Sequence, residues 1–341
     1  MSTVKRLPSA TTAMCTLSPQ YKNEALAELR EAVQFTEKFW CDESTVVIDT
    51  VVPFDAMSAK LRSISPVFVR HIMPVHATFE YAYDLDDIKD FLRGQAGAIH
   101  TDYVIQPRWI GEHILPFSTS ELTQTIEAAL GKEASNGYSK DDIAVSAVIH
   151  DTTMYIGMSF VHNNLNPWAG GMRHYKLTDD MISRAEFKLL EALELFNVRL
   201  PKNGTAIDLG AAPGGWTYIL RQKGLHVIAI DPGELDKRLQ SDEGITHMQR
   251  KAQEAFPFAE QADCIVNDMR MNGDDSAYIM SNAATSLHTG AIGIMTIKLP
   301  EENPLPVLKK TVKILSRHYK IISVRQLFHN RHEATIFLSR S

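Results

Sequence analysis

The chain has 341 residues, of which 44% are hydrophobic and 22% are charged, and its formal net charge is −6. This length exceeds one typical domain, and the composition excludes a disordered chain. No apolar stretch approaches the roughly 20 residues that a membrane-spanning helix needs. The cysteines Cys15, Cys41 and Cys264 lie far apart in sequence with no CxxC pair. This spacing argues against a zinc ribbon or a disulfide scaffold, so we expect a cytoplasmic protein without a metal site.

Charge is distributed unevenly along the chain. Residues 1–180 hold 15 basic and 23 acidic side chains, whereas residues 181–341 hold 20 basic and 18 acidic ones. Neither half has the strongly basic signature of many nucleic-acid binders, so contacts with a nucleic acid would have to come from local patches. Residues 1–23 include no apolar core of a signal peptide, and we expect a short, unprocessed tail that leads into a first strand.

Residues 1–80 are predicted to form a small α+β domain. Apolar and β-branched segments predict strands, and helical spacing of apolar residues predicts helices. The order is a strand at 11–17, a helix at 23–33, a strand at 46–52, a helix at 55–62 and a strand at 66–75. Alternation of this kind within about 70 residues suggests a ferredoxin-like module.

Residues 81–165 are predicted to form a second α+β region, followed by a linker. The predicted elements are helices at 86–92 and 120–130 and strands at 102–106, 143–150 and 153–161. A hairpin turn at Asp151 and Thr152 joins the last two strands. The stretch that follows is rich in Asn, Pro and Gly, which is typical of a loop, and we place a linker at 166–180.

From residue 181 onward, strands and helices alternate. Strands are predicted at 205–209, 226–230, 264–267, 292–298, 321–326 and 334–338, and helices at 181–196, 214–223, 278–287 and 304–319. Such alternation indicates a mostly parallel sheet with helices on both faces. We therefore predict that the fold class is α/β and that residues 181–341 form a Rossmann-like domain.

A glycine-rich loop in this last domain carries the strongest functional signal. The predicted strand 205–209 leads into Gly-Ala-Ala-Pro-Gly-Gly-Trp at 210–216, and a helix follows at once. A loop of this kind holds a cofactor at the carboxyl end of a parallel sheet, because glycine lets the backbone approach a ligand closely. Asp231 ends the next predicted strand, where it can accept hydrogen bonds from ribose hydroxyls.

The loop favours S-adenosylmethionine over NAD. A dinucleotide loop of the form G-x-G-x-x-G directs free N–H groups at a pyrophosphate. Here Pro213 has no N–H group, and the second glycine of that spacing is missing. S-adenosylmethionine needs no such phosphate site, because it is a nucleoside with a sulfonium and an amino-acid tail. A glycine turn that binds no ligand remains an alternative.

Residues 208–217 resemble the signature of the FtsJ-like ribose-2′-O-methyltransferases. Within this class the chain most resembles the RlmM-type enzymes, the 23S ribosomal RNA cytidine-2′-O-methyltransferases that carry a THUMP domain. Further matching motifs follow in the same order at 155–159, 163–168, 183–192, 267–269, 297–300 and 325–333. The resemblance implies a class I methyltransferase domain at 181–341. In residues 1–152 it rests on element order alone, and there it implies a THUMP-like RNA-binding domain at 81–165.

The resemblance also implies a Lys-Asp-Lys-Glu catalytic tetrad. Its members match Lys188, Asp268, Lys298 and Glu333. The last three lie at strand ends, on the rim of the sheet where ligands bind. A ribose 2′-hydroxyl is a weak nucleophile, so the protein has to orient it and relieve it of its proton. We expect Lys298 to be the base or the orienting group, with Lys188 and Asp268 setting its charge and geometry. Glu333 would hold the hydroxyl or a lysine in place.

The cofactor contacts are predicted from the loop and the resemblance together. Relatives have an adenine-contacting acid after the third strand, and this acid has no clean match at 248–256, where we substitute Glu254. The predicted cofactor-binding residues are Ser183, Gly210, Ala212, Pro213, Gly214, Gly215, Trp216, Asp231, Glu254 and Asp268.

RNA contacts are predicted from basic side chains that could follow the phosphates, and from one aromatic ring. The candidates in the C-terminal half are Lys309, Lys310, Lys313, Arg317, Lys320, Arg325, Arg331 and His332. In the acidic N-terminal half they are Arg70, His71 and Arg108. Trp168 could stack on a base or pack between domains.

The sequence thus predicts an S-adenosylmethionine-dependent RNA ribose-2′-O-methyltransferase. Large-subunit ribosomal RNA, and within it a 23S cytidine, is the expected substrate, and no membrane or DNA partner is expected. Two alternatives stay open: the same chemistry on transfer RNA or another RNA, and an RNA-binding or ribosome assembly factor without turnover. An NAD-dependent oxidoreductase is disfavoured by Pro213.

Overall fold

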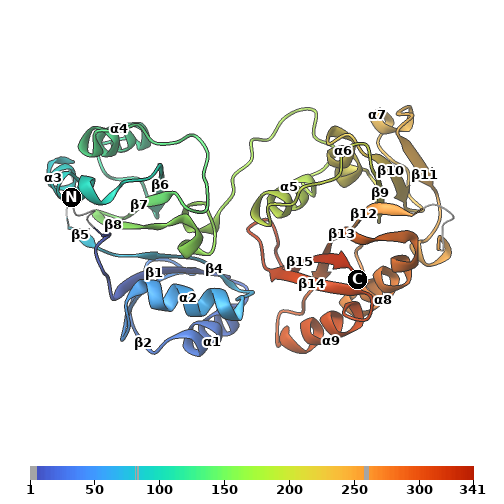
Figure 1. Ribbon diagram of the computed structural model, residues 1–341, viewed down its shortest axis with the longest axis horizontal. Helices are drawn as coiled ribbons and strands as arrows, with labels where there is room; N and C mark the ends of the chain where they lie inside the picture. The colour runs from blue at the N-terminus through green and yellow to red at the C-terminus, as the bar shows by residue number, and fades with distance from the viewer. Residues whose placement is uncertain (1–5, 81, 83, 257–260) are drawn as a thin grey trace. The chain divides into compact units, whose positions relative to one another are not determined.

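The chain divides into two compact units, Met1–Met172 and Arg173–Ser341. The computed structural model describes residues 6–80, 82, 84–256 and 261–341. Figure 1 shows the elements of both units. Within the described ranges, the structure has no helix of the length and apolar character required to cross a bilayer.

The first half of the N-terminal unit is a four-stranded antiparallel sheet with two helices. Its order along the chain is β1 (Thr12–Leu17), α1 (Lys22–Ala32), β2 (Phe35–Trp40), β3 (Thr45–Thr50), α2 (Phe54–Ile64) and β4 (Val69–Pro74). In the sheet the strands lie in the order β2-β3-β1-β4, with every neighbouring pair antiparallel. The order β-α-β-β-α-β is that of a ferredoxin-like module. The sequence did not predict β2, because this edge strand is mostly exposed and lacks an apolar run.

The second half of this unit adds another four-stranded sheet. Its elements are β5 (Ala77–Phe79), α3 (Asp86–Gln95), β6 (Tyr103–Ile110), α4 (Thr119–Leu130), β7 (Ile143–His150) and β8 (Thr153–Phe160). The strand order is β5-β8-β7-β6, in which β6 and β7 run parallel. The hairpin between β7 and β8 is confirmed, and its turn residue Asp151 has a φ of 54°. The THUMP-like interpretation of residues 81–165 stays a prediction.

Alternate residues of the second sheet enter two different cores. On β7, Ile143 and Val145 face a core that includes apolar side chains of α3 and α4. Val148 faces the other way and packs with Met14 and Met73 of the first sheet. The two sheets therefore face each other, and the helices cover their outer sides (Figure 1). This alternation follows from the two-residue period of a strand.

The segment predicted as a linker starts inside the N-terminal unit. The carbonyl oxygen of Pro167 accepts a hydrogen bond from the Gln106 side chain at 2.7 Å. A Cβ atom at Gly170 would lie 2.6 Å from the Arg108 guanidinium, so the backbone rests directly on that side chain. The N-terminal unit therefore continues through Met172.

The three basic side chains of this unit that were expected to contact RNA are buried. Arg70 and Arg108 are each 7% exposed, and His71 is 2% exposed. Arg108 donates to the hydroxyl groups of Thr16 and Thr45 at 2.8 and 2.9 Å. The expectation that these side chains reach RNA is therefore wrong, because they face the interior of the unit.

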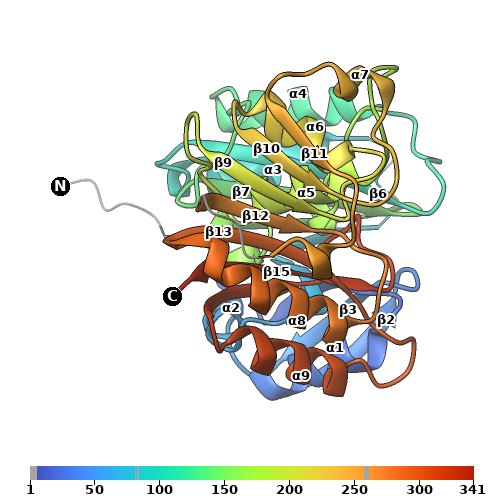
Figure 2. The same cartoon turned by 90° about the vertical axis from the view of Figure 1, so that its right-hand side faces the viewer.

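The C-terminal unit is a seven-stranded sheet between two layers of helices. Its helices are α5 (Glu186–Leu195), α6 (Gly215–Gln222), α7 (Lys237–Gln240), α8 (Gly273–Ala283) and α9 (Leu305–Leu315). Its strands are β9 (Thr205–Leu209), β10 (His226–Ile230), β11 (Ile245–Met248), β12 (Ala262–Asn267), β13 (Leu287–Lys298), β14 (Tyr319–Arg325) and β15 (Glu333–Arg340). Figure 2 shows α5 and α6 on one face of the sheet and α8 and α9 on the other.

The strand order in this sheet is β11-β10-β9-β12-β13-β15-β14. The strand β15 pairs antiparallel with both of its neighbours, and the other pairs are parallel. The predicted α/β class with a mostly parallel sheet is thus confirmed. The helix predicted at 278–287 instead starts at Gly273, where the side chain of Asn272 caps it by accepting from the Asp275 N–H at 2.9 Å.

Candidate active site

Strand directions in the C-terminal unit bring three of the four predicted catalytic residues to one edge of the sheet. Asp268 follows the last residue of β12, and Lys298 is the last residue of β13. Glu333 is the first residue of β15. Because β15 runs against the other strands, its start lies at the edge where they end, and the register pairs Glu333 directly with Lys298.

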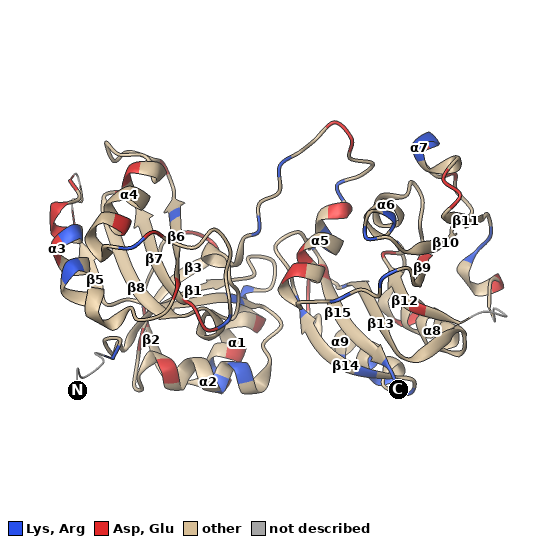
Figure 3. Ribbon diagram, turned by 45° about the horizontal axis from the view of Figure 1, so that its top comes forward, with Lys and Arg blue, Asp and Glu red and all other residues tan. Residues whose placement is uncertain are grey.

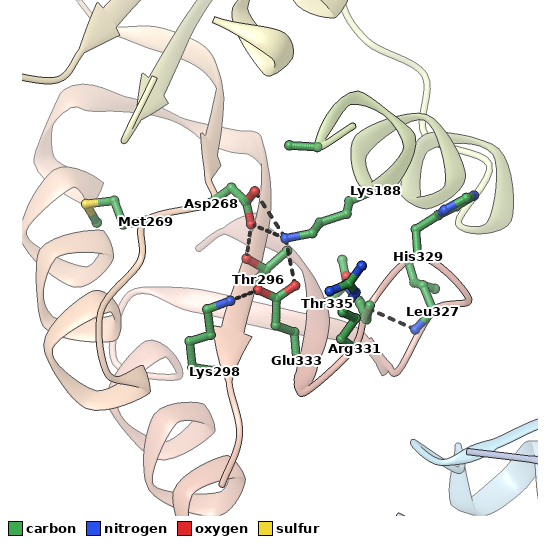
Figure 4. A network of polar contacts seen from close by, with 12 residues as sticks. Lys188, Asp268, Met269, Thr296, Lys298, Leu327, His329, Arg331, Glu333 and Thr335 are labelled. Atoms are coloured by element: carbon green, nitrogen blue, oxygen red, sulfur yellow. Dashed lines mark hydrogen bonds and ion pairs between the residues drawn. The ribbon is translucent and has the colours of Figure 1, made fainter. Parts of the chain in front are cut away.

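Helix α5 supplies the fourth residue, and the four side chains form one connected cluster. The Nζ atom of Lys188 donates to Asp268 Oδ1 at 3.1 Å and lies 2.7 Å from Glu333 Oε2. The Nζ atom of Lys298 donates to the other oxygen of Glu333, Oε1. Figure 4 shows that both lysines point at Glu333 from different elements. The structure therefore joins all four residues that the sequence singled out.

The cluster is buried at one end and open at the other. The side chain of Glu333 is 4% exposed, that of Lys188 is 18% exposed and that of Lys298 is 49% exposed. Lys298 thus has the most exposed side chain of the four.

In the cluster, burial and ion pairing shift the pKa of each group in opposite directions. Burial lowers the pKa of Lys188, but the charges of Asp268 and Glu333 outweigh it, and the net shift is upward. Burial raises the pKa of Glu333, but the two lysines hold it below its ordinary value. For Asp268, burial dominates and raises the pKa despite the charge of Lys188. Lys188 and Glu333 are therefore held as a charged pair.

Thr296 is a further member of the cluster that sequence reasoning missed. Its hydroxyl donates to Asp268 Oδ1, and the residue is 3% exposed. Thr296 lies two positions before Lys298 on β13, so both side chains are on the same face of the strand. That two-residue spacing from a predicted catalytic lysine is the signal that could have found it.

A pocket of about 790 Å³ adjoins the cluster at the carboxyl ends of β9, β10 and β12. Eight of the predicted cofactor residues line it, namely Ser183, Gly210, Ala212, Pro213, Gly215, Trp216, Asp231 and Asp268. The sequence did not single out other lining residues, among them Arg184, Asp208, Lys251, Gln253, Met269 and Arg270. Asp268 belongs to both the pocket wall and the charged cluster.

Glycine is required in the loop for two different reasons. Gly214 has a φ of 115°, and a Cβ atom there would lie 2.3 Å from a methyl group of Leu239. A Cβ atom at Gly215 would lie 2.3 Å from the hydroxyl of Ser183. Gly214 permits the turn. It is not among the described residues that line the pocket, and its contact with the cofactor stays a prediction.

Two carboxylates, those of Asp208 and Asp231, line the pocket. Asp208 is 1% exposed and accepts a hydrogen bond from the Thr217 hydroxyl at 2.6 Å. Burial, reinforced by the charges of Asp268 and Asp231, raises the pKa of Asp208 to about 7. Asp231 follows β10, and its Oδ1 atom accepts from the Gly233 N–H at 2.7 Å. The position of Asp231 at the end of the second strand is the one predicted for ribose contacts.

Glu254, the predicted substitute for the adenine-contacting acid, ends a short 3₁₀ turn at Ala252–Glu254. Its neighbours Lys251, Ala252 and Gln253 line the pocket, whereas Glu254 is not among the lining residues in the described ranges. The assignment to Glu254 stays a prediction, and the turn offers Gln253 to the pocket in its place.

The predicted RNA contacts in this unit differ in exposure. Lys309 and Lys313 are exposed on α9, where Figure 3 shows basic positions close together, and Lys310 pairs with Asp274. Arg331 is exposed beside the cluster, whereas Arg325 is only 8% exposed. The expectation for Arg325 is wrong, because its side chain is buried.

Comparison with known proteins supports the assignment of the C-terminal unit. Residues 181–303 match the FtsJ-like methyltransferase family. The resemblance to the RlmM-type enzymes is also confirmed. Ribosomal RNA large subunit methyltransferase M of Halorhodospira halophila is 33% identical over 176 residues, which cover 51% of each chain. The protein of the same name from Tolumonas auensis is 31% identical over 203 residues, covering 55% of this chain and 54% of that protein.

The chain spans about half the length of the curated relatives that it matches. Among solved structures, TrmN from Thermus thermophilus aligns over 97% of this chain and 99% of that chain, with 14% identity and a TM-score of 0.38. A TM-score of this size supports no further conclusion.

Proposed function

We propose that this chain is an S-adenosylmethionine-dependent RNA methyltransferase that methylates a ribose 2′-hydroxyl. The observation that carries the proposal is the double role of Asp268, which lines the pocket and also pairs with Lys188 in the charged cluster. A cofactor in this pocket would thus lie against groups that can handle a hydroxyl and its proton. The FtsJ-like match over 181–303 supports this reaction class.

The residues of the pocket fit S-adenosylmethionine. The volume of about 790 Å³ lies within the range of small-molecule sites. The glycine loop lets the backbone form one wall, and Asp231 stands at the strand end where ribose hydroxyls would bind. Pro213 lines the pocket and has no N–H to offer a pyrophosphate, which disfavours a dinucleotide. When bound, S-adenosylmethionine supplies an activated methyl group.

The four clustered residues have separate roles in the proposed reaction. Lys188 is fixed by Asp268 and Glu333 and acts as a charged anchor inside the cluster. Glu333 fixes Lys298 at the rim. Lys298, which is half exposed, is assigned the contact with the 2′-hydroxyl, either as the base that removes its proton or as the group that orients it. Orientation alone contributes strongly to such a transfer.

The proposed substrate is large-subunit ribosomal RNA, with a cytidine of 23S RNA as the target. The names of the relatives from Halorhodospira halophila and Tolumonas auensis support a ribosomal RNA of the large subunit. With this substrate, the proposed place of action is the cytoplasm. The exposed lysines of α9 and the exposed Arg331 are available for contacts with phosphates.

Two measurements on the purified chain test the proposal. Calorimetry should show binding of S-adenosylmethionine and none of NAD. The methyl-labelled cofactor should then transfer label to ribosomal RNA of a strain that lacks the gene, in an alkali-resistant linkage at a cytidine. Label in transfer RNA instead would contradict the proposed substrate but support the proposed reaction. Cofactor binding without methyl transfer to free RNA or to pre-ribosomal particles would contradict the proposal that the chain is an enzyme. It would favour an assembly factor instead.

A further inference from the structure

A buried carboxylate ties the helix that carries Lys188 to the loop that carries Glu333. Glu191 lies on α5, three residues after Lys188, so both side chains are on the same side of the helix. It is 0% exposed. Its Oε1 atom accepts from the backbone N–H of Phe328 and its Oε2 atom from that of His329, both at 2.9 Å. Hydrogen bonds to a carboxylate are stronger than those between neutral groups.

The loop that Glu191 holds is a preformed unit. It covers residues 326–332, between the end of β14 and the start of β15. The side chain of Asn330 accepts from the Leu327 N–H and from the Thr335 hydroxyl, each at 2.9 Å. The side chain of Gln326 donates to the carbonyl of Arg331 at 2.6 Å. Because these bonds fix the shape of the loop, its place relative to α5 depends on the contacts that bridge the two.

Those contacts connect α5 both to Glu333 and to the loop that precedes it. Lys188 reaches from α5 to Glu333 at 2.7 Å, and Glu191 reaches from the same helix to the backbone of the loop, four and five residues before Glu333. Figure 4 shows the loop residues Leu327, His329 and Arg331 lying beside the cluster. The ion pair and the two hydrogen bonds, with the ring contact between Phe187 of α5 and His329, therefore contribute to how closely Glu333 approaches Lys188.

We propose that Glu191 is a positioning residue for methyl transfer, which sets the place of Glu333 and, through it, that of Lys298. The inference rests on the proposed function, because it assigns Glu191 to the geometry of the same site. A displacement of about 1 Å at a reacting group is enough to slow a reaction about 100-fold. Loss of one anchor of the loop should therefore affect the rate without affecting the cofactor pocket.

The test uses Glu191→Gln in the full chain. The amide keeps one oxygen acceptor but turns an NH₂ group toward the other backbone N–H, so one hydrogen bond is lost without a change of volume. We expect kcat for methyl transfer to fall about 10- to 100-fold. KM for RNA and Kd for S-adenosylmethionine should stay within about twofold, since Glu191 is not among the described residues that line the pocket.

The matched control is Glu28→Gln in the N-terminal unit. Glu28 lies on α1 and accepts from the backbone N–H groups of Val67, Phe68 and Val69 at 2.7, 2.8 and 3.0 Å. It is thus an anchor of the same kind, on a helix that carries no member of the cluster. Its variant should lower Tm while kcat of the folded protein stays within about twofold of wild type.

Glu191→Asp sharpens the test, because it keeps both acceptor oxygens on a shorter side chain and should recover part of the lost kcat. A Glu191→Gln protein that is folded and has wild-type kcat would overturn the inference while leaving the proposed function intact. So would a loss of activity that follows only the folded fraction. An inactive wild-type chain would overturn the proposed function and this inference with it.

Discussion

Each unit of the chain contains a buried polar cluster built around a basic side chain. In the N-terminal unit, Arg108 bridges the two sheets by donating to the hydroxyls of Thr16 and Thr45, and it lies 3.7 Å from Asp42. In the C-terminal unit, Lys188 is held between Asp268 and Glu333. Both arrangements satisfy a charge that would be costly to bury alone.

The two clusters differ in what reaches solvent. The Arg108 side chain is 6% exposed, and Gly170 rests on its guanidinium group. The neighbouring His71 is neutral at physiological pH, because burial, followed by the charge of Arg108, lowers its pKa to about 3. In the C-terminal cluster, by contrast, Lys298 is 49% exposed and Asp268 lines a large pocket. An enclosed cluster can only hold structure together, whereas one that opens into a pocket can act on a ligand.

The largest expected effect comes from Glu333, which both lysines of the open cluster contact. Glu333→Gln removes the charge that fixes Lys188 and Lys298, and we expect kcat for methyl transfer to fall about 1,000-fold. Kd for S-adenosylmethionine, measured by calorimetry, should change less than about threefold. A variant that stays folded and keeps more than a tenth of the wild-type rate would contradict a catalytic role for the cluster.

The enclosed cluster should respond in the opposite way. Arg108→Met leaves Thr16 and Thr45 without their donor, and we expect the free energy of unfolding in urea to fall by about 3 kcal/mol. Cofactor affinity should not change, because Arg108 is not part of the C-terminal unit. Unchanged stability together with lost methyl transfer would show that the Arg108 cluster serves the reaction. The two clusters would then not differ in the way described above.

An effect that depends on pH is expected from Asp208, which lines the pocket. Its pKa is about 7 in the folded chain and about 3.9 when unfolded, so the folded state binds the extra proton between these values. Asp208 therefore stabilises the fold below about pH 4, and this contribution is lost as pH rises toward 7. Asp208→Asn should gain stability relative to wild type over that range, by roughly 1.4 kcal/mol for each unit of pKa shift.

Urea unfolding of the cofactor-free chain at pH 4.5, 6 and 8 checks this expectation. The difference in free energy between the Asn variant and wild type should grow with pH. A difference that is constant across the three values would mean that Asp208 titrates normally in the folded chain.

The resemblance to the FtsJ-like enzymes pointed to the four residues of the open cluster, and strand order explains why three of them meet. Once β12, β13 and β15 are assigned, Asp268, Lys298 and Glu333 must share an edge of the sheet. Glu191 could not be recognised in the same way. Its role depends on contacts with backbone groups 137 and 138 positions away, which no local pattern encodes.

The same limit explains the errors. Arg70, Arg108 and Arg325 read as exposed basic residues in sequence, yet each is less than a tenth exposed because tertiary contacts bury it. The edge strand β2 escaped prediction because one strand at the border of a sheet needs little apolar surface. Whether a polar side chain is buried depends on how helices and strands pack in three dimensions. The order of helices and strands along the chain, in contrast, can be predicted from the local periodicity of apolar residues.

The most direct test of the central claim compares wild type with Lys298→Ala in transfer of labelled methyl groups to large-subunit ribosomal RNA. Both proteins should bind S-adenosylmethionine with similar Kd, because Lys298 is not among the described residues that line the pocket. Only wild type should produce label in an alkali-resistant linkage, which marks a 2′-O-methyl group. Equal amounts of this product from both proteins would contradict the account.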